Sequence, residues 1–274
     1  MKKYGPLFVL LSALFFATGG LLIKLNTMSS VSISGGRSFF AFFVMLAYML
    51  LRHHHFRFNA VVLFGALANA GMSLTFTIAT KMTTAANAIV LQFMMPVFII
   101  FLLWIFWKQK PDRLAICTVA LSIVGMLFFF LESLSAGSMA GNLIAIFSGF
   151  LYAIVFLIKK IPNSDFESSI LISHGLNFLI GIPSLISEPN INTANIIGII
   201  LLGAFQMGLA FIFLNLGLDN VQPVAASLIS MIEPILNPIL VAVFYGETMG
   251  VFAIIGAIIV LGSATFYNLR SSSA

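Results

Sequence analysis

The stretch Val221–Glu247 reads VQPVAASLISMIEPILNPILVAVFYGE and combines features that a membrane-spanning helix ordinarily avoids. A carboxylate, Glu233, lies near the centre of a mostly apolar run, with Pro234 directly after it and Pro238 four residues later. A charge at the middle of a bilayer costs on the order of 3 kcal/mol on insertion scales. A proline removes a backbone donor and clashes with the preceding turn. The stretch therefore predicts a helix that is interrupted where it lines a polar space.

The composition of the whole chain indicates an integral membrane protein. Of its 274 residues, 61% are hydrophobic and only 8% are charged, and its mean hydropathy is +1.12. A soluble domain carries about 25% charged residues, and a chain of this length has too little interior to bury so much apolar surface. Its apolar runs are about 20 residues long, enough for a helix to cross the hydrocarbon, and they lack strand alternation. We therefore expect an all-α fold.

Ten apolar segments follow one another along the chain, joined by short connections. They cover about 5–25, 31–51, 61–80, 85–107, 113–131, 141–159, 167–187, 194–217, 221–244 and 250–268. Short connections place successive helices beside one another in opposite directions. We therefore predict a compact bundle of ten transmembrane helices with no soluble domain.

Lysine and arginine are divided unequally between the two ends of these segments. With the N-terminus in the cytoplasm, the opposite side carries only Lys24 and Lys81. The cytoplasmic side carries Lys2, Lys3, Arg52, Arg57, Lys108, Lys110, Arg113, Lys159, Lys160 and Arg270. Because cytoplasmic loops are enriched in these residues, we expect a multi-pass protein of the cell inner (cytoplasmic) membrane with both termini cytoplasmic. The net charge of +5 is then explained by basic residues in the cytoplasmic loops, which set the orientation of the helices in the membrane. We therefore expect no nucleic-acid partner.

The two halves of the chain resemble each other. The segment Gly5–Lys24 aligns with Gly141–Lys160 at an offset of 136, where Gly5, Leu7, Ser12, Ala17 and Lys24 all recur, and Pro96 aligns with Pro234 at an offset of 138. Each half holds five segments, and because five is odd, the second half enters the membrane from the opposite side. We therefore predict two inverted five-helix repeats, over 1–134 and 135–274. In such an architecture the same packing can open toward either side of the membrane.

The lone arginine of the second segment and the motifs of the last two segments resemble those of the EamA family of the drug/metabolite transporter superfamily. The matching residues are Arg37 in SGGRSFFAFF, Glu233-Pro234, Gly246-Glu247, and Gly256 with Gly262. The chain departs from the family where Met95 stands opposite Glu233 and where the turn after the fourth segment, WKQKPDR, lacks a glutamate. The resemblance implies transport of metabolites such as amino acids, nucleobases or similar solutes, with export more common than import.

Polar side chains recur near the middle of several segments, at the depth expected from the helical rise of about 1.5 Å per residue. They are Asn69, Gln92, Tyr152, His174, Asn177, Gln206 and Glu233, and Ser230 and Asn237 share one helical face with Glu233. Because buried polar groups need partners, these residues are candidates for a substrate-binding cavity at the midplane. Alternatively, each one makes an isolated interhelical hydrogen bond, worth about 0.6 kcal/mol on average.

Arg37 is a further substrate-binding candidate, about six residues inside the outer end of its segment. Its guanidinium has three alternatives: it reaches the outer interface, it pairs with Glu233, or it meets an anionic group of the substrate.

Signatures of catalysis are missing from the sequence. His53-His54-His55 point in different directions on a regular helix and have no acidic residue nearby, so we read them as part of a basic loop. Cys117 is the one cysteine, and no HExxH, GxSxG or Walker sequence is present. We therefore expect that the protein is not an enzyme and that it has no cofactor and no metal site.

The leading hypothesis is a secondary transporter that moves a small organic metabolite by alternating access. Since no ATP-binding sequence is present, a coupled proton or cation, or the solute's own gradient, must drive it. Glu233 is the group expected to meet the ion, because a buried carboxylate needs a proton or a cation. The alternatives are a facilitative channel and an intramembrane lipid-modifying enzyme, for which only His174 lies at depth. The expected partners are a small-molecule substrate and membrane lipid.

Overall fold

The computed structural model describes residues 4–83, 85–131, 138–236, 239 and 250–272, and within them every regular element is helical. The elements of the first half are α1 (Gly5–Ala17), α2 (Gly19–Leu25), α3 (Ser30–Leu51), α4 (Ala60–Met82), α5 (Ala85–Gln92), α6 (Met95–Trp107) and α7 (Arg113–Phe129). Those of the second half are α8 (Met139–Leu157), η2 (Ile158–Lys160), α9 (Phe166–Ile186), α10 (Thr193–Leu201), η3 (Leu202–Leu209), α11 (Ala210–Leu218), α12 (Pro223–Ser230) and α14 (Val251–Ser272). The all-α prediction is confirmed for this part of the chain.

Eight of the expected segments are long and apolar enough to cross a membrane. They are Gly5–Ile23, Ser30–Leu51, Ala60–Met82, Asn87–Trp107, Met139–Lys160, Phe166–Ile186, Thr193–Leu218 and Val251–Arg270. The fifth and ninth expected segments correspond to shorter apolar helices, Arg113–Phe129 and Pro223–Leu236, which border residues outside the described ranges. The count of ten spans therefore stays a prediction.

Local sequence explains where many of these helices begin. A side-chain oxygen at the N-cap satisfies a backbone N–H of the first turn, which has no partner within the helix. Such caps are provided by Ser29, Asn59, Ser138, Asp165 and Asn192. Most of these polar residues stand between two apolar runs, so they fix both the end of a loop and the start of a span.

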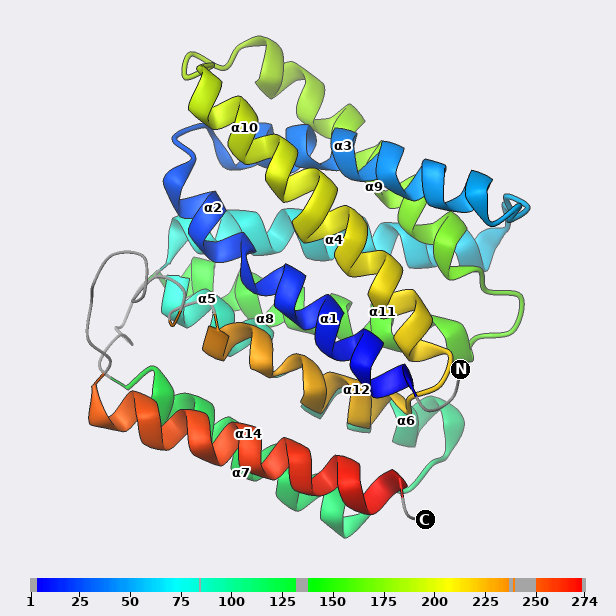
Figure 1. Cartoon of the computed structure of the whole chain (residues 1–274), viewed down its shortest axis with the longest axis vertical. Helices are drawn as coiled ribbons and strands as arrows, with labels where there is room; N and C mark the ends of the chain where they lie inside the picture. The colour runs from blue at the N-terminus through cyan, green and yellow to red at the C-terminus, as the bar shows by residue number, and fades with distance from the viewer. Residues whose placement is uncertain (1–3, 84, 132–137, 237–238, 240–249, 273–274) are drawn as a thin grey trace.

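Helices from the two halves pack against each other in related pairs (Figure 1). The helix α3 packs along α9, and α7 packs along α14, so corresponding spans of the two halves meet. The helix α4 packs on α8 and α1 packs on α11, and these two contacts exchange when the halves are exchanged. This pattern fits a two-repeat architecture.

Glycines allow the closest of these contacts. A Cβ atom built on Gly35 of α3 would lie 2.6 Å from the Cα of Gly181 in α9. One built on Gly203 would lie 2.4 Å from the carbonyl oxygen of Arg37, and one on Gly256 of α14 would lie 2.4 Å from that of Gly125. Small residues at helix interfaces let backbones approach in this way in membranes.

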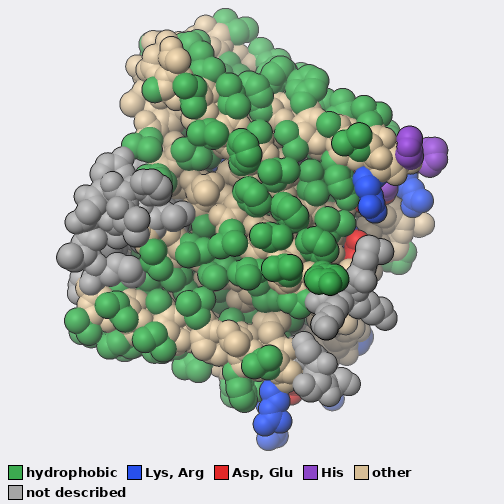
Figure 2. All heavy atoms as spheres, viewed as in Figure 1, with side chains coloured by type: hydrophobic (Ala, Val, Ile, Leu, Met, Phe, Trp, Pro, Cys, Tyr) green, Lys and Arg blue, Asp and Glu red, His purple; other side chains and the backbone are tan. Residues whose placement is uncertain are grey.

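The surface separates an apolar flank from a basic end. Figure 2 shows hydrophobic side chains along the flanks of the helices, with Lys, Arg and His side chains gathered where the helices end. The basic end includes the loop His53–His55, Arg57, and Lys159 with Lys160. At the opposite end, Glu188 follows α9. This distribution is typical of a helical bundle that spans a bilayer.

Candidate functional site

The fourth and ninth spans are both interrupted one turn before a proline. The helix α5 ends at Gln92 and α6 begins at Met95, directly before Pro96. The helix α12 ends at Ser230, and helical structure resumes before Pro234. Because proline lacks an N–H, the carbonyl four residues before it loses its usual donor. The interruption predicted for the stretch around Glu233 is therefore confirmed, and its counterpart in the first half shares it.

Two further spans depart from regular α-helix near the same level. The first span breaks between α1 and α2 at Thr18, whose hydroxyl donates to the carbonyl of Phe15 at 2.7 Å. In the eighth span, the element η3 is a π-helix that carries Gln206. Such π-helical turns are frequent at functional sites.

These irregular elements surround a small polar cavity. Its walls are formed by Phe16, Arg37, Met72, Ser73, Phe76, Gln92, Tyr152, Gln206, Met207 and Glu233. Five of them, Arg37, Gln92, Tyr152, Gln206 and Glu233, are candidates that the sequence analysis selected. The cavity encloses about 30 Å³, which is room for about two water molecules at roughly 15 Å³ each.

Corresponding spans of both halves contribute to the cavity walls. Phe16 and Tyr152 occupy the same position in the first and sixth spans, at the offset of 136 that relates the two halves. Gln92 comes from the fourth span, four residues before Pro96, and Glu233 comes from the ninth, directly before Pro234. The cavity therefore lies between the two halves.

Arg37 is buried and held by α4. Its side chain is 2% exposed, and Nη2 donates to the hydroxyls of Ser73 and Thr77, both at 2.9 Å, and to the carbonyl of Ser73 at 3.2 Å. The guanidinium thus does not reach the outer interface, which was one of its three alternatives. Its Nε atom is buried without a hydrogen-bond partner among the described residues.

Gln92 is held by a hydrogen bond to a serine, whereas Gln206 packs closely against a glycine. Gln92 Nε2 donates to Ser148 Oγ at 2.8 Å, and Ser148 in turn donates to the carbonyl of Met72 at 3.0 Å. Gln206 lies against the backbone of Gly19, where a Cβ atom would come within 2.8 Å of its Nε2.

Three cavity-lining side chains keep buried atoms that have no hydrogen-bond partner among the described residues. The atoms are Arg37 Nε, Gln206 Oε1 and Glu233 Oε2. Buried polar groups without partners are uncommon and ask for an explanation. Together they offer one donor and two acceptors to a polar solute.

Three other candidates, one on α4 and two on α9, do not line the cavity. Asn69 Nδ2 donates to Ser173 Oγ at 2.6 Å, and Asn177 Nδ2 donates to the carbonyl of Ala70 at 3.3 Å. Both contacts fit the alternative of isolated interhelical hydrogen bonds. The ring of His174 packs edge-on against Phe211, and both of its nitrogens are buried without partners in the described chain.

The remaining two candidates belong to the ninth span. Ser230 is buried and donates to the carbonyl of Ala226 at 3.0 Å, within its own helix, and it does not line the cavity. Asn237 lies outside the described residues.

The sequence analysis missed several residues that the cavity uses. Phe16, Met72, Phe76 and Met207 form its apolar walls, and Ser73 supplies a hydroxyl that holds Arg37. The apolar residues carry no signal, since similar side chains fill every span. Ser73 and Thr77 are four residues apart and therefore face the same side of a helix, a pattern that marks a partner for a buried cation.

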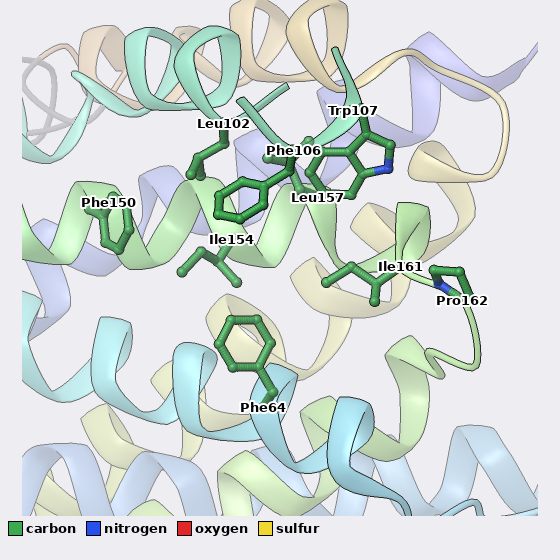
Figure 3. Close-up of a pocket in the computed structure, with 9 residues that line it drawn as sticks. All are labelled: Phe64, Leu102, Phe106, Trp107, Phe150, Ile154, Leu157, Ile161 and Pro162. Carbon is green, nitrogen blue, oxygen red and sulfur yellow. The ribbon is translucent and has the colours of Figure 1, made fainter. Parts of the chain in front are cut away.

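A larger groove on the surface is lined by hydrophobic residues. It has a volume of about 480 Å³ and is lined by Phe64, Leu102, Phe106, Trp107, Phe150, Ile154, Leu157, Ile161 and Pro162 (Figure 3). Phe64 and Phe106 are exposed, so the groove opens to the outside of the bundle. Because a specific site needs polar groups that fix the orientation of a ligand, the cavity with Arg37 and Glu233 is a better candidate for a specific site than this groove.

Comparisons with known proteins agree with the motifs. The sequence profile of the EamA-like transporter family matches residues 3–131 and again residues 139–269. An "Uncharacterized transporter" from Archaeoglobus fulgidus is 23% identical over 263 residues, which cover 94% of each chain. A solved structure titled "Crystal structure of protein" has a TM-score of 0.84 and 15% identity over 98% of this chain and 99% of that one, a likeness of fold alone. Because the two family matches together cover nearly the whole chain, this multi-pass membrane transporter belongs to the EamA-like transporter family.

Proposed function

We propose that the chain is a secondary transporter that moves a small organic metabolite across the cytoplasmic membrane by alternating access. The observation that carries the proposal is the cavity between the two halves, which holds Arg37, Glu233 and two glutamines. Charged groups inside a membrane are rare and mark substrate or ion pathways. The proposal includes two inverted repeats, over 1–134 and 135–274, with both termini cytoplasmic.

The cavity favours a solute that carries charge and hydrogen-bonding groups. Arg37 suits an anionic group such as a carboxylate, because guanidinium and carboxylate make strong charge-assisted hydrogen bonds. Glu233 suits an amine or another donor, and the rings of Phe16, Phe76 and Tyr152 offer apolar walls. An amino acid meets these requirements, and a nucleobase or similar solute uses the same donors and acceptors. Following the family resemblance, we propose export as the physiological direction.

Transport requires the cavity walls to separate, because about 30 Å³ is too small for any of these solutes. The interrupted spans are suited to this movement. Breaks at Thr18, before Met95 and after Ser230 let the two parts of a span tilt independently. The helices that meet the cavity from either half would then part at one end while the other end stays closed.

Glu233 is the proposed site of coupling to a proton or a cation. The test measures solute flux in proteoliposomes as a function of pH. We expect Glu233→Gln to lose the pH response and most of the uphill transport, while Glu188→Gln, at the opposite end and away from the cavity, keeps both. Full transport by Glu233→Gln with an unchanged pH response would contradict this role.

The carrier mechanism itself needs a separate measurement. We expect saturable counterflow, in which unlabelled solute inside the vesicle accelerates the uptake of labelled solute. A facilitative channel gives no such acceleration. The solute for this assay can be found by thermal-shift screening of metabolites, because a ligand that binds the folded state raises its stability.

A further inference from the structure

A histidine and two carboxylates converge at the basic end, away from the cavity. His54 lies in the loop between α3 and α4, whereas Asp165 and Glu167 lie at the start of α9, more than a hundred residues later. One ligand atom from each of the three lies within 4.8 Å of the other two. His54 Nε2 and Asp165 Oδ2 are 2.9 Å apart. The histidine run that lacks an acidic neighbour in the sequence thus acquires two in the fold.

The spacing of these atoms matches a metal-binding site. Bonds of about 2.0–2.1 Å in tetrahedral geometry separate neighbouring ligand atoms by roughly 3.3 Å. His54 Nε2 and Asp165 Oδ2 are 2.9 Å apart, and all three atoms lie within 4.8 Å of one another, which brackets that separation. One imidazole nitrogen and two carboxylate oxygens suit a borderline first-row cation such as Zn²⁺, whereas Mg²⁺ and Ca²⁺ prefer oxygen ligands alone.

Neighbouring groups hold both carboxylates in place and leave one oxygen of each for a ligand. Asp165 is 8% exposed, and its Oδ1 accepts the backbone N–H of Ser168 at 2.8 Å. Glu167 Oε1 accepts Asn215 Nδ2 at 2.7 Å. Hydrogen bonds of this kind orient metal ligands in characterised sites. The nearby cation Lys159 is paired with Asp219, so it does not occupy the cluster.

We propose that His54, Asp165 and Glu167 form a binding site for one divalent first-row cation of the Zn²⁺ type. Water completes the coordination. The bound ion joins the α3–α4 loop to the start of α9 and so clamps the basic end of these two helices. Binding weakens in acid, because protons compete for the imidazole and the carboxylates.

The test uses full-length protein in detergent, without a histidine tag and after treatment with a chelator. We expect equilibrium dialysis to find one equivalent of Zn²⁺, Co²⁺ to give the absorption bands of a tetrahedral site, and Zn²⁺ to raise the melting temperature. His54→Ala should weaken binding at least tenfold. His55→Ala is the matched control, because His55 is exposed and outside the cluster, and it should bind like the wild type.

A second variant, Glu167→Gln, keeps the proposal testable if His54→Ala fails to fold. Glu167→Gln keeps an oxygen for Asn215 but removes the charge, so it should fold and still bind Zn²⁺ at least tenfold more weakly. Absence of stoichiometric binding to the wild type would overturn the proposal. Equal weakening by His54→Ala and His55→Ala would overturn it as well, since it would indicate diffuse binding by the surface histidines.

Discussion

At the scale of single residues, the guanidinium of Arg37 shows how a charge is accommodated inside the bundle. It depends on oxygens of α4, which surround Nη2 at 2.9–3.2 Å. These bonds offset part of the desolvation of the cation and fix the direction in which it faces the cavity. The arginine is therefore already oriented before any solute enters.

We expect Thr77→Val to lower the free energy of unfolding by about 1 kcal/mol, because it removes an acceptor from a buried cation. Thr80→Val on the same helix is the control, since within the described part of the chain the hydroxyl of Thr80 bonds to the carbonyl of Phe76 in its own helix and to no other helix. Unfolding of both variants in detergent measures the difference. Equal destabilisation of the two variants would show that the hydrogen bond from Arg37 to Thr77 contributes nothing to the free energy of unfolding.

Glu188 provides a pH-dependent contact at the opposite end. Burial opposes its ionisation, but hydrogen bonds from the backbone and hydroxyl of Ser29, from Ser32 and from the backbone of Asn190 outweigh it, so the pKa of the Glu188 carboxyl is lowered. A lowered folded-state pKa stabilises the protein above the unfolded value of about 4.3 and ceases to do so as the pH falls through the folded value. We expect Glu188→Gln to melt below the wild type at pH 7 and to match it near pH 3. A constant gap across this range would contradict the assignment.

The sequence predicted which residues lie deep, but not which way they face. Counting along the helices selected Gln92 and Glu233 as residues near the middle of their spans and Arg37 about six residues inside the outer end, and these three residues line one cavity. Asn69 and Asn177 lie deep as well, yet they face the contact between α4 and α9. The direction of a side chain depends on the rotation of its helix against its neighbours, and a uniformly apolar span gives little information about that rotation.

At the scale of the helices, a proline marks two of the four departures from regular helix around the cavity, and the other two have no proline. Pro96 and Pro234 mark the breaks in the fourth and ninth spans. The break at Thr18 and the π-helix Leu202–Leu209 have no proline within them. These irregularities depend on tertiary contacts, such as Gly19 against Gln206, that a single span does not encode.

The close contact between α3 and α9 depends on two glycines, which have no side chains to hold the helices apart. We expect Gly35→Ala to destabilise the protein by about 1–3 kcal/mol, because its methyl group would meet the backbone of Gly181 and force the helices apart. Gly262→Ala in α14 is the control, since no atom of the described residues lies within 4 Å of its Cβ position. Thermal unfolding in detergent compares the two. A Gly35→Ala variant as stable as Gly262→Ala would show that this contact can relax freely.

At the scale of the whole molecule, α3 and α9 are joined at both ends. Ser32 Oγ lies 2.7 Å from Ser184 Oγ at one end, and His54 meets Asp165 at the other. Gly35 and Gly181 touch between them. A pair held in three places along its length is suited to act as a fixed support for the interrupted spans during the proposed transport cycle.

We therefore expect a disulfide between α3 and α9 to leave transport intact. Ser32→Cys with Ser184→Cys places two thiols where two hydroxyls already touch, in a Cys117→Ala background that removes the native cysteine. Flux should be the same after oxidation and after reduction, with each single variant as control. Flux that stops on oxidation and returns on reduction would show instead that this pair separates in each cycle.

The shared location of Arg37 and Glu233 has a consequence for the electrical behaviour of the carrier. With an ionised carboxylate the empty cavity carries no net charge from these two groups, whereas with a protonated one it carries a single positive charge. Moving one charge through 100 mV is worth about 2.3 kcal/mol, or nearly two orders of magnitude in an equilibrium constant. If the chain works by the proposed alternating access with a proton on Glu233, the membrane voltage discriminates between the two forms of the empty carrier, and the direction of net transport then depends on the electrical potential of the cell as well as on the proton gradient.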